Sequence, residues 1–597
     1  MVSGEIKILT PTGMLGYSFS EDLFWSAVKD GVDAIILDSG STDSGPAKLA
    51  LGQTTTSRQA YERDLRILVS ACHHHRVPVL IGSAGGDGTN AHVALLLEIV
   101  AEIVAREGFR TLNVVTIEAE IPKSTVQAKF EGGLVTPCGH GVPELRQADI
   151  NDATVIVAQM GMEPWLNAMQ VHPDFDIIIA GRSYDPAPFA AFCVHKGLPD
   201  LGLAYHMGKI MECGGVCAVP KSAEALATVR HGSFDIRPLS PTARCTPLSV
   251  AAHTLYEKSR PDLLAGPGGV LDVSHSRFEQ LEDGRTVRVT GSKFSPAADG
   301  TYTVKLEGAR VAGYTAMFIG GIRDPIMISQ LDCLIPMIQD KLRAVVSCQF
   351  ELAIQLYGHN PLVKGLDLGC HGYAPAEIGV LGKVLAPTQD DAKTVANLAK
   401  VFFTHAPYPG QVANAGNFMM PFSPCDLALG PATEFCVYHL MQVDNPGEQF
   451  PFAARATLRD LSAEIKANIT PMAAKQSIAH LSPPPPPGFV YLASLASVIR
   501  TKNCGPFQLT IDVMFSDRET FERVRSAGIL SRETISHLYS VQNPEDIIAC
   551  LWWETALAFK ATIKRPVVSG SFRDNDVHGS GWHVPLLYLQ VPAPGSV

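Results

Sequence analysis

The chain has 597 residues, of which 46% are hydrophobic, and its formal net charge is −11 at pH 7. At about 150 residues a domain, this length predicts about two to four domains, and the apolar content excludes an intrinsically disordered chain. The acidic balance and the absence of Lys/Arg runs argue against nucleic-acid and anionic-membrane partners. The 13 cysteines are scattered, the N-terminus lacks a signal-peptide pattern, and apolar runs stay below the ~20 residues of a bilayer span. We therefore expect a reduced, cytoplasmic protein.

The first 190 residues alternate between apolar strand patterns and helical patterns. Strands are expected at residues 6–9, 32–37, 77–81, 112–117, 153–157 and 176–180, and helices at 21–29, 60–75 and 91–106. Near-continuous apolar strands separated by helices predict an α/β fold, a mostly parallel sheet with helices on both faces. In such sheets, ligands bind beyond the carboxyl ends of the strands.

The rest of the chain changes character twice. Residues 266–320 contain short alternating segments with Gly and Pro between them, which indicate an antiparallel β-rich insertion, and residues 325–356 have helical spacing. Five consecutive prolines at 483–487 predict a linker over residues 456–488. We therefore expect a core over residues 1–455 and a small α+β domain over 489–597, with a strand at 509–515 and a helix at 518–526.

The loop from Gly82 to Asn90 reads GSAGGDGTN and joins a predicted strand to a predicted helix. Glycines let a ligand approach the backbone, and a helix N-terminus favours a phosphate, a carboxylate or a thioester oxyanion. The alternative is a tight turn with a helix cap. Residues 85–89 also resemble the GGDGT signature of NAD and lipid kinases, so a nucleotide-dependent kinase is a minor alternative. The candidate ligand-binding residues of this loop are Ser83, Gly85, Gly86, Asp87 and Asn90.

A second polar segment, DSGSTDSG, follows the strand predicted at 32–37. Asp38 is a candidate general base, and Ser39, Ser41 and Asp43 are candidate substrate-binding residues. Asp and Ser also favour turns, so a capped turn is an equal alternative.

Three further segments offer acids, bases or an anion clamp. Arg182 could hold a carboxylate in two hydrogen bonds, with Asp185 beside it, although the two could also be a simple turn pair. Glu212 would have a raised pKa if it were buried, as an acid/base requires, while Cys213 is more typical of packing than of a nucleophile. His140 lies between glycines and is a candidate acid/base.

Four of these motifs, in this order, resemble the acyclic terpene utilisation (AtuA) family over about residues 5–455. They are DSGSTD at 38–43, IGSAGG at 81–86, AGRSYDP at 180–186 and ECGG at 212–215. The match departs at Ala180, where the family pattern has Thr, and at Asp87, where a small residue is expected. The resemblance implies a role in the breakdown of branched isoprenoid acids through acyl-CoA intermediates.

Residues 496–507 of the small domain resemble the RSKNAGPF signature of an uncharacterised domain family. In bacteria, this domain resembles a separate small protein beside an AtuA-like one. The fusion therefore implies that both parts work as one unit, as expected for a fungal version of such a pair. Arg500, Lys502 and Asn503 are its candidate substrate-binding residues.

These observations favour an enzyme that acts on a hydroxy- or unsaturated carboxylic acid, or on its CoA thioester. The expected reaction is addition or elimination next to a carbonyl, as in a hydratase, a dehydratase or a carbon–carbon lyase. The alternative is a non-catalytic binding or scaffold protein. We expect a small anionic ligand and a homo-oligomer. No cofactor or metal site is identified, and CoA is considered only as part of the substrate.

Overall fold

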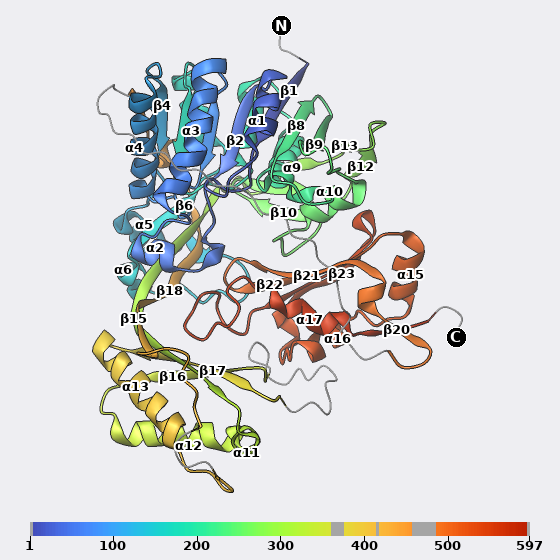
Figure 1. Ribbon diagram of the computed structural model, residues 1–597. Coiled ribbons are helices and arrows are strands. Elements are labelled where there is room, and N and C mark those ends of the chain that lie inside the picture. The colour runs from blue at the N-terminus through green and yellow to red at the C-terminus, as the bar shows by residue number, and fades with distance from the viewer. Residues whose placement is uncertain (1–3, 360–374, 413–416, 457–484, 594–597) are drawn as a thin grey trace.

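The structure is a computed structural model that describes residues 4–359, 375–412, 417–456 and 485–593. Its described strands form a ten-stranded sheet, a six-stranded sheet, a four-stranded sheet and two smaller sheets. Figure 1 shows three regions: an α/β region at the top, a lobe at the end of a long β-ribbon at the lower left, and the C-terminal domain at the right.

The ten-stranded sheet has a parallel centre of near-continuous apolar strands. The central strands are β1 (Glu5–Thr10), β2 (Ala34–Asp38), β3 (Val79–Gly82), β7 (Ile177–Ala180) and β4 (Asn113–Ile117), in that spatial order. Antiparallel strands flank them: β8 (Ala225–Arg230), β9 (Ser233–Pro238), β13 (Val287–Thr290) and β12 (Arg277–Gln280) beside β1, and β19 (Phe452–Ala456) beside β4. The predicted fold class is confirmed.

Helices cover both faces of this sheet because successive strand residues point to opposite sides. Leu9, Ile35 and Leu37 pack in one apolar cluster with α1 (Glu21–Lys29), α3 (Arg58–His75) and α4 (Asn90–Glu107). Ile8 and Ile36 point the other way into a second cluster. The helices of this second cluster are α5 (Lys123–Glu131), α6 (Gln147–Asp152), α7 (Glu163–Val171), α8 (Ala187–His195) and α9 (Leu201–Met211).

The six-stranded sheet is built on two long antiparallel strands, β15 (Thr303–Ile322) and β18 (Asp426–Gln442). Its other members are β16 (Glu351–Tyr357), β17 (Ile378–Ala386), β5 (Val135–Pro137) and β6 (Val155–Gln159). The start of β15 lies beside the α/β region, where it pairs with β6, and its far end enters the lobe. There, α11 (Pro325–Ile328), α12 (Leu331–Val345) and α13 (Gln389–His405) bury the apolar face of the sheet.

The C-terminal domain has an antiparallel sheet in the order β21 (Ala496–Cys504), β22 (Gln508–Phe515), β24 (Ala558–Lys564) and β23 (Ile547–Trp553). Its helices α15 (Arg518–Ser526), α16 (Arg532–Leu538) and α17 (Val584–Leu587) share one apolar cluster with the sheet. Strands β20 (Phe489–Tyr491) and β25 (Gln590–Pro592) pair at its margin. The remaining α-helices and strands of the described residues are short: α2 (Ala47–Leu51), α10 (Pro247–Thr254), α14 (Pro446–Gln449), β10 (Leu263–Gly266), β11 (Gly269–Asp272) and β14 (Lys293–Pro296).

Two sequence predictions about the fold are wrong in detail. The strand predicted at 153–157 is β6, which leaves the parallel sheet and pairs antiparallel with β15. The helical pattern predicted for 325–356 ends at Val345, and ELAIQLY forms β16 instead, which pairs antiparallel with β17. The antiparallel β-rich character predicted for 266–320 is confirmed: its strands are β11, β12, β13, β14 and β15, which belong to three sheets. Most of the predicted linker at 456–488 lies outside the described residues.

Within the described ranges, no helix is both long enough and apolar enough to cross a membrane.

Candidate functional site

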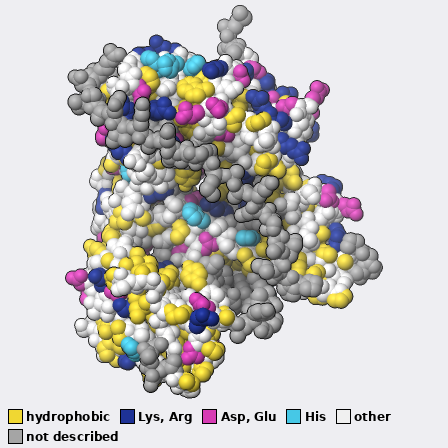
Figure 2. Space-filling view, viewed as in Figure 1, with side chains coloured by type: hydrophobic (Ala, Val, Ile, Leu, Met, Phe, Trp, Pro, Cys, Tyr) yellow, Lys and Arg dark blue, Asp and Glu magenta, His cyan; other side chains and the backbone are white. Residues whose placement is uncertain are grey.

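The predicted polar segments meet where the parallel strands end. Asp38 ends β2, Arg182 follows β7, and Glu212 follows α9. The start of β15 and the C-terminal domain close the same space. Figure 2 shows the molecule hollowed between these regions, with acidic, basic and histidine side chains inside the recess.

A buried ion-pair network built on Arg182 and Glu307 lies at the centre of the site. Arg182 Nε lies 2.7 Å from Glu307 Oε2, and Arg182 Nη1 donates to Ser83 Oγ at 3.1 Å. Glu307 is fully buried on β15, accepts from Thr42 Oγ1 at 3.2 Å and forms an ion pair with Lys305 at 2.8 Å. Burial alone would raise the pKa of Glu307, but Arg182 and Lys305 outweigh it and bring the pKa to about 2. Arg182 is thus charged and held in place, and part of its hydrogen-bonding capacity is used by Glu307, a carboxylate of the same chain.

Asp38 and Asp185 both interact with Arg182. Arg182 Nη1 is 3.5 Å from Asp185 Oδ1, so the predicted turn pair is present, and 32% of the Asp185 side chain is exposed. Burial first, and then the charge of Asp185, raise the pKa of Asp38 well above its ordinary value. A carboxyl group with a raised pKa holds its proton more strongly than a free one and can exchange that proton with a ligand.

Glu212 is the second carboxyl with a strongly perturbed pKa. It pairs with buried Lys209, and its Oε2 has no hydrogen-bond partner among the described residues. Burial raises the pKa of Glu212 to about 7 against the opposing effect of Lys209. This pKa suits proton transfer near neutral pH. Burial also raises the pKa of the neighbouring Cys213 thiol, which disfavours a thiolate nucleophile.

The C-terminal domain reaches this group of charges through Lys502 on β21. Lys502 Nζ lies 3.2 Å from Glu257 Oε1, and both interact electrostatically with Asp43. Burial and Glu257 raise the pKa of Asp43, while Lys502 and Lys305 lower it. Glu257 has a φ of +61°, a left-handed conformation that costs a non-glycine residue energy and is typical of functional sites.

The loop from Gly82 to Asn90 packs against the other loops of the site, and this close packing requires glycines. Residues 82–89 are all buried. A Cβ on Gly88 would lie 2.0 Å from the backbone N of Arg182, and a Cβ on Gly40 would lie 2.4 Å from the Cα of Gly86. The backbone N–H of Gly85 donates to Ser39 Oγ at 3.1 Å. The loop therefore brings the segments that follow β2, β3 and β7 into direct contact.

Acidic side chains of this chain already occupy the N-terminus of α4. Asp87 Oδ1 accepts from the Thr89 N–H at 2.9 Å and lies 2.6 Å from His92 Nδ1. The N–H of Asn90 donates to Glu120 Oε1 at 2.8 Å. An external anion at this helix end would compete with these carboxylates.

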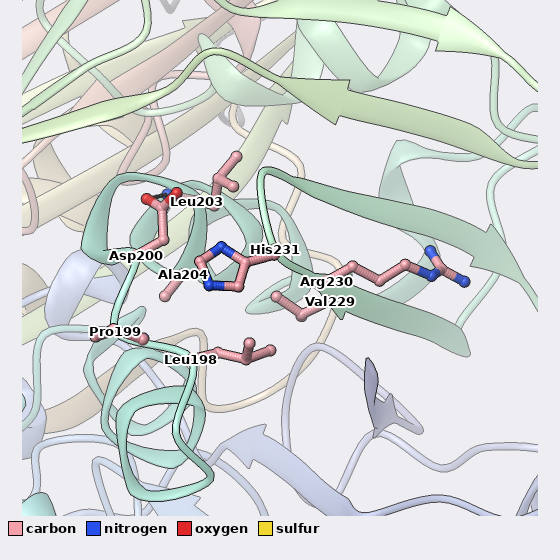
Figure 3. A pocket seen from close by; sticks show the side chains of 8 residues that line it. All are labelled: Leu198, Pro199, Asp200, Leu203, Ala204, Val229, Arg230 and His231. Carbon is pink, nitrogen blue, oxygen red and sulfur yellow. Dashed lines mark hydrogen bonds between the residues drawn. The ribbon is translucent and has the colours of Figure 1, made fainter. Parts of the chain in front are cut away.

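Asn90 lines a separate cleft of about 550 Å³ with Glu118, Glu120, Lys123 and Gln449. A smaller cavity lies beside the turn between β8 and β9 (Figure 3), where Arg230 pairs with Glu5 at the amino edge of the sheet. With about 10 Å³ between Leu198, Asp200 and His231, it has room for little more than a water molecule.

The other predicted residues have local partners. Ser41 Oγ accepts from the Asp43 N–H at 3.0 Å, as the turn reading expects. His140 lies away from the network, half-exposed, with Nε2 3.0 Å from Asp546 Oδ1. Arg500 donates to Asp512 and to the Ala252 carbonyl. Asn503 is buried inside the C-terminal domain, where it donates to Val577 O at 2.6 Å and to Ser569 Oγ at 3.2 Å and accepts from Arg565.

Sequence reasoning missed four charged residues of the site: Lys209, Glu257, Lys305 and Glu307. Only Lys209 carried a usable signal, because its spacing of three from Glu212 on a helix end places the two side chains together. Glu307 lies in an alternating strand pattern, and nothing in that pattern shows which other segment it faces.

The fold and site define an α/β protein whose buried acids and cations lie where the strands of the main sheet end, next to a second, C-terminal α+β domain. Residues 6–421 match the acyclic terpene utilisation family protein AtuA, so the chain belongs to this family. Residues 492–590 match a domain of unknown function, DUF4387. Both predicted resemblances are confirmed. No curated protein and no solved structure matches the chain. Among the residues described, no group of three or more His, Cys, Asp or Glu side chains is arranged to hold a metal ion.

Proposed function

We propose that this protein is an enzyme of acyclic terpene utilisation that acts on a hydroxy- or unsaturated carboxylic acid or its CoA thioester. The reaction is addition or elimination next to the carbonyl. One observation carries the proposal: two carboxyl groups with raised pKa values, Asp38 and Glu212, interact electrostatically within a buried site beside the fixed cation Arg182. Membership of the AtuA family supports the substrate class.

In a dehydration, the base removes a proton from the carbon next to the carbonyl, and the electron pair of that bond forms the double bond. The bond from the adjacent carbon to the hydroxyl oxygen breaks, and this oxygen leaves as water with a proton from the acid. Asp38 and Glu212 can exchange these protons. The charge of Arg182 stabilises the negative charge that develops on the carbonyl oxygen. Such stabilisation is strongest when the cation is already in place and little water surrounds it.

The test measures turnover of crotonyl-CoA, 3-hydroxybutyryl-CoA, their branched analogues and the free acids by the full chain. Asp38→Asn and Glu212→Gln should each lower kcat/KM by about 100-fold or more, as loss of a general acid or base does. Glu434→Gln is a matched control, because Glu434 pairs with Arg310 on the same ribbon and both side chains are partly exposed. Activity of both site variants within about threefold of wild type would contradict the proposal; that threshold lies well below the smallest effect of a lost acid or base.

A non-catalytic binding protein is the second candidate, and one observation favours it. Arg182 is already neutralised by Glu307, as expected for a cluster that serves the structure. If the wild-type chain binds one of these compounds but converts none, this reading replaces the first. The kinase reading is not proposed, because the backbone of residues 85–89 is buried against other loops of the chain.

A further inference from the structure

We infer that the C-terminal domain is a fixed part of the site and that its Lys502 binds a carboxylate of the substrate. This inference rests on the proposed function and assigns a role to the domain of unknown function.

The first evidence is the two-sided character of the C-terminal sheet. Alternate residues of β22, such as Leu509, Ile511 and Val513, face the apolar cluster of the domain. The residues between them share a polar face with their neighbours on β21 and β24. Asp512, for example, lies opposite Arg500 on one side and Lys560 on the other. Lys502 lies on this polar face, two residues from Arg500.

The polar face is docked against the core by contacts that exclude water. Lys560 is fully buried, forms an ion pair with Asp512 at 2.8 Å and donates to the Leu255 carbonyl at 3.1 Å. Thr562 Oγ1 donates to the Ser259 carbonyl at 2.9 Å. A buried lysine that lost these partners would carry an uncompensated charge. The domain therefore holds one position against residues 252–259, and Lys502 is placed rigidly rather than by a mobile lid.

Among the cations of this face, Lys502 has N–H donors that make no hydrogen bond to the described residues. Arg500 and Lys560 have carboxylate and carbonyl partners that fix them in the interface. For Lys502, Glu257 is the one hydrogen-bond partner among the described residues, although an ammonium group has three donors. Its side chain is 17% exposed, so part of it is accessible from outside the protein. The ammonium group of Lys502 is held in place and keeps two N–H donors, which suit the acceptor oxygens of a carboxylate.

The surroundings of Lys502 connect it to the proposed chemistry. Asp43 interacts with Lys502, Lys305 and Arg182, and it belongs to the segment that starts at Asp38. The strained backbone of Glu257 holds the acceptor that positions the ammonium. Lys502 is thus a binding residue at the C-terminal side of the same site, and the substrate is one that retains a free carboxylate.

The experiment measures binding of sodium crotonate and of neutral crotonamide to the full chain by titration calorimetry. Lys502→Gln should weaken crotonate binding by about tenfold or more, the scale of one lost hydrogen bond to a charged group. It should leave crotonamide binding unchanged, and Lys502→Arg should recover part of the affinity. Lys564→Gln is the matched control: it lies at the rim of the same face, 44% exposed. Unchanged far-UV circular dichroism verifies that each variant is folded.

Crotonate affinity of Lys502→Gln within about twofold of wild type would overturn the inference, because a lost charged hydrogen bond costs more than that. So would an equal loss for crotonamide, or the absence of crotonate binding by the wild-type chain. These outcomes differ from failure of the proposed function, which is decided by the turnover of Asp38→Asn and Glu212→Gln. Lys502→Gln should raise KM for acids that carry a free carboxylate more than it lowers kcat.

Discussion

Replacing Glu307 with Gln tests whether the buried network holds the ribbon against the α/β region. Glu307 is fully buried and its pKa falls from 4.5 to about 2 on folding, which corresponds to roughly 3 kcal/mol of stability. Removing one partner from a buried ion pair costs about 3–5 kcal/mol by experience with other proteins, so the two estimates agree. In Glu307→Gln, the buried Arg182 and the partly buried Lys305 lose their shared carboxylate. We expect the free energy of unfolding to fall by roughly 3 kcal/mol at neutral pH.

The assay is urea unfolding followed by tryptophan fluorescence, since Trp165 is fully buried in the α/β core. Because the pKa of Glu307 is lowered on folding, its contribution is fully present above pH 4.5 and is lost as the pH falls towards 2. The wild-type chain should lose this stability in that window, and the variant should not. Glu434→Gln, whose partner Arg310 is partly exposed, should cost less than about 1 kcal/mol. Equal effects of the two substitutions would refute the reasoning.

Three further predictions concern the loop, the interface and the acid. Gly88→Ala should prevent normal folding, because the new Cβ would collide with the backbone of Arg182. Gly108 has nearly the same φ but open space around it, so Gly108→Ala should cost only about 1–2 kcal/mol of backbone strain. Thermal melting compares the two variants. Asp512→Asn should destabilise the interface by about 3–5 kcal/mol, since Lys560 stays buried, and limited proteolysis should release the C-terminal domain. The pH–rate profile should have a limb near pH 7 that Glu212→Gln abolishes, and an unchanged limb would remove Glu212 from the proton transfer.

Local patterns in the sequence were sufficient for the α/β region. The helix at 21–29 was predicted to the residue from the helical spacing of its apolar side chains. In the structure, Ser20 caps this helix and two acids follow in its first turn. The central strands were predicted because their burial on both faces leaves a nearly unbroken apolar run. The same property explains the error at β6: an apolar run shows that a strand is buried, not which strand it pairs with.

The site was predictable only where it follows the strand ends. Asp38, Arg182 and Asp185 meet because carboxyl ends of parallel strands share one edge, which the strand pattern implies. Glu307 could not be found, since it enters from a strand of another sheet, more than a hundred residues away in sequence from its partner. Successive residues of a strand point to opposite faces of the sheet. Lys502 therefore faces the core, whereas Asn503 faces the interior of its own domain.

The interface between the two family regions explains why a single chain carries both. A sheet face that places Lys560 and Asp512 fully inside the protein is costly to expose or to leave half-paired. The partners that complete it are main-chain carbonyls of Leu255 and Ser259, which come from the segment that also presents Glu257 to the site. Docking the domain and placing Lys502 beside Glu257 are therefore one event. Joining the two regions in one chain keeps their effective concentration high, so the buried lysine finds its carbonyls without a separate encounter.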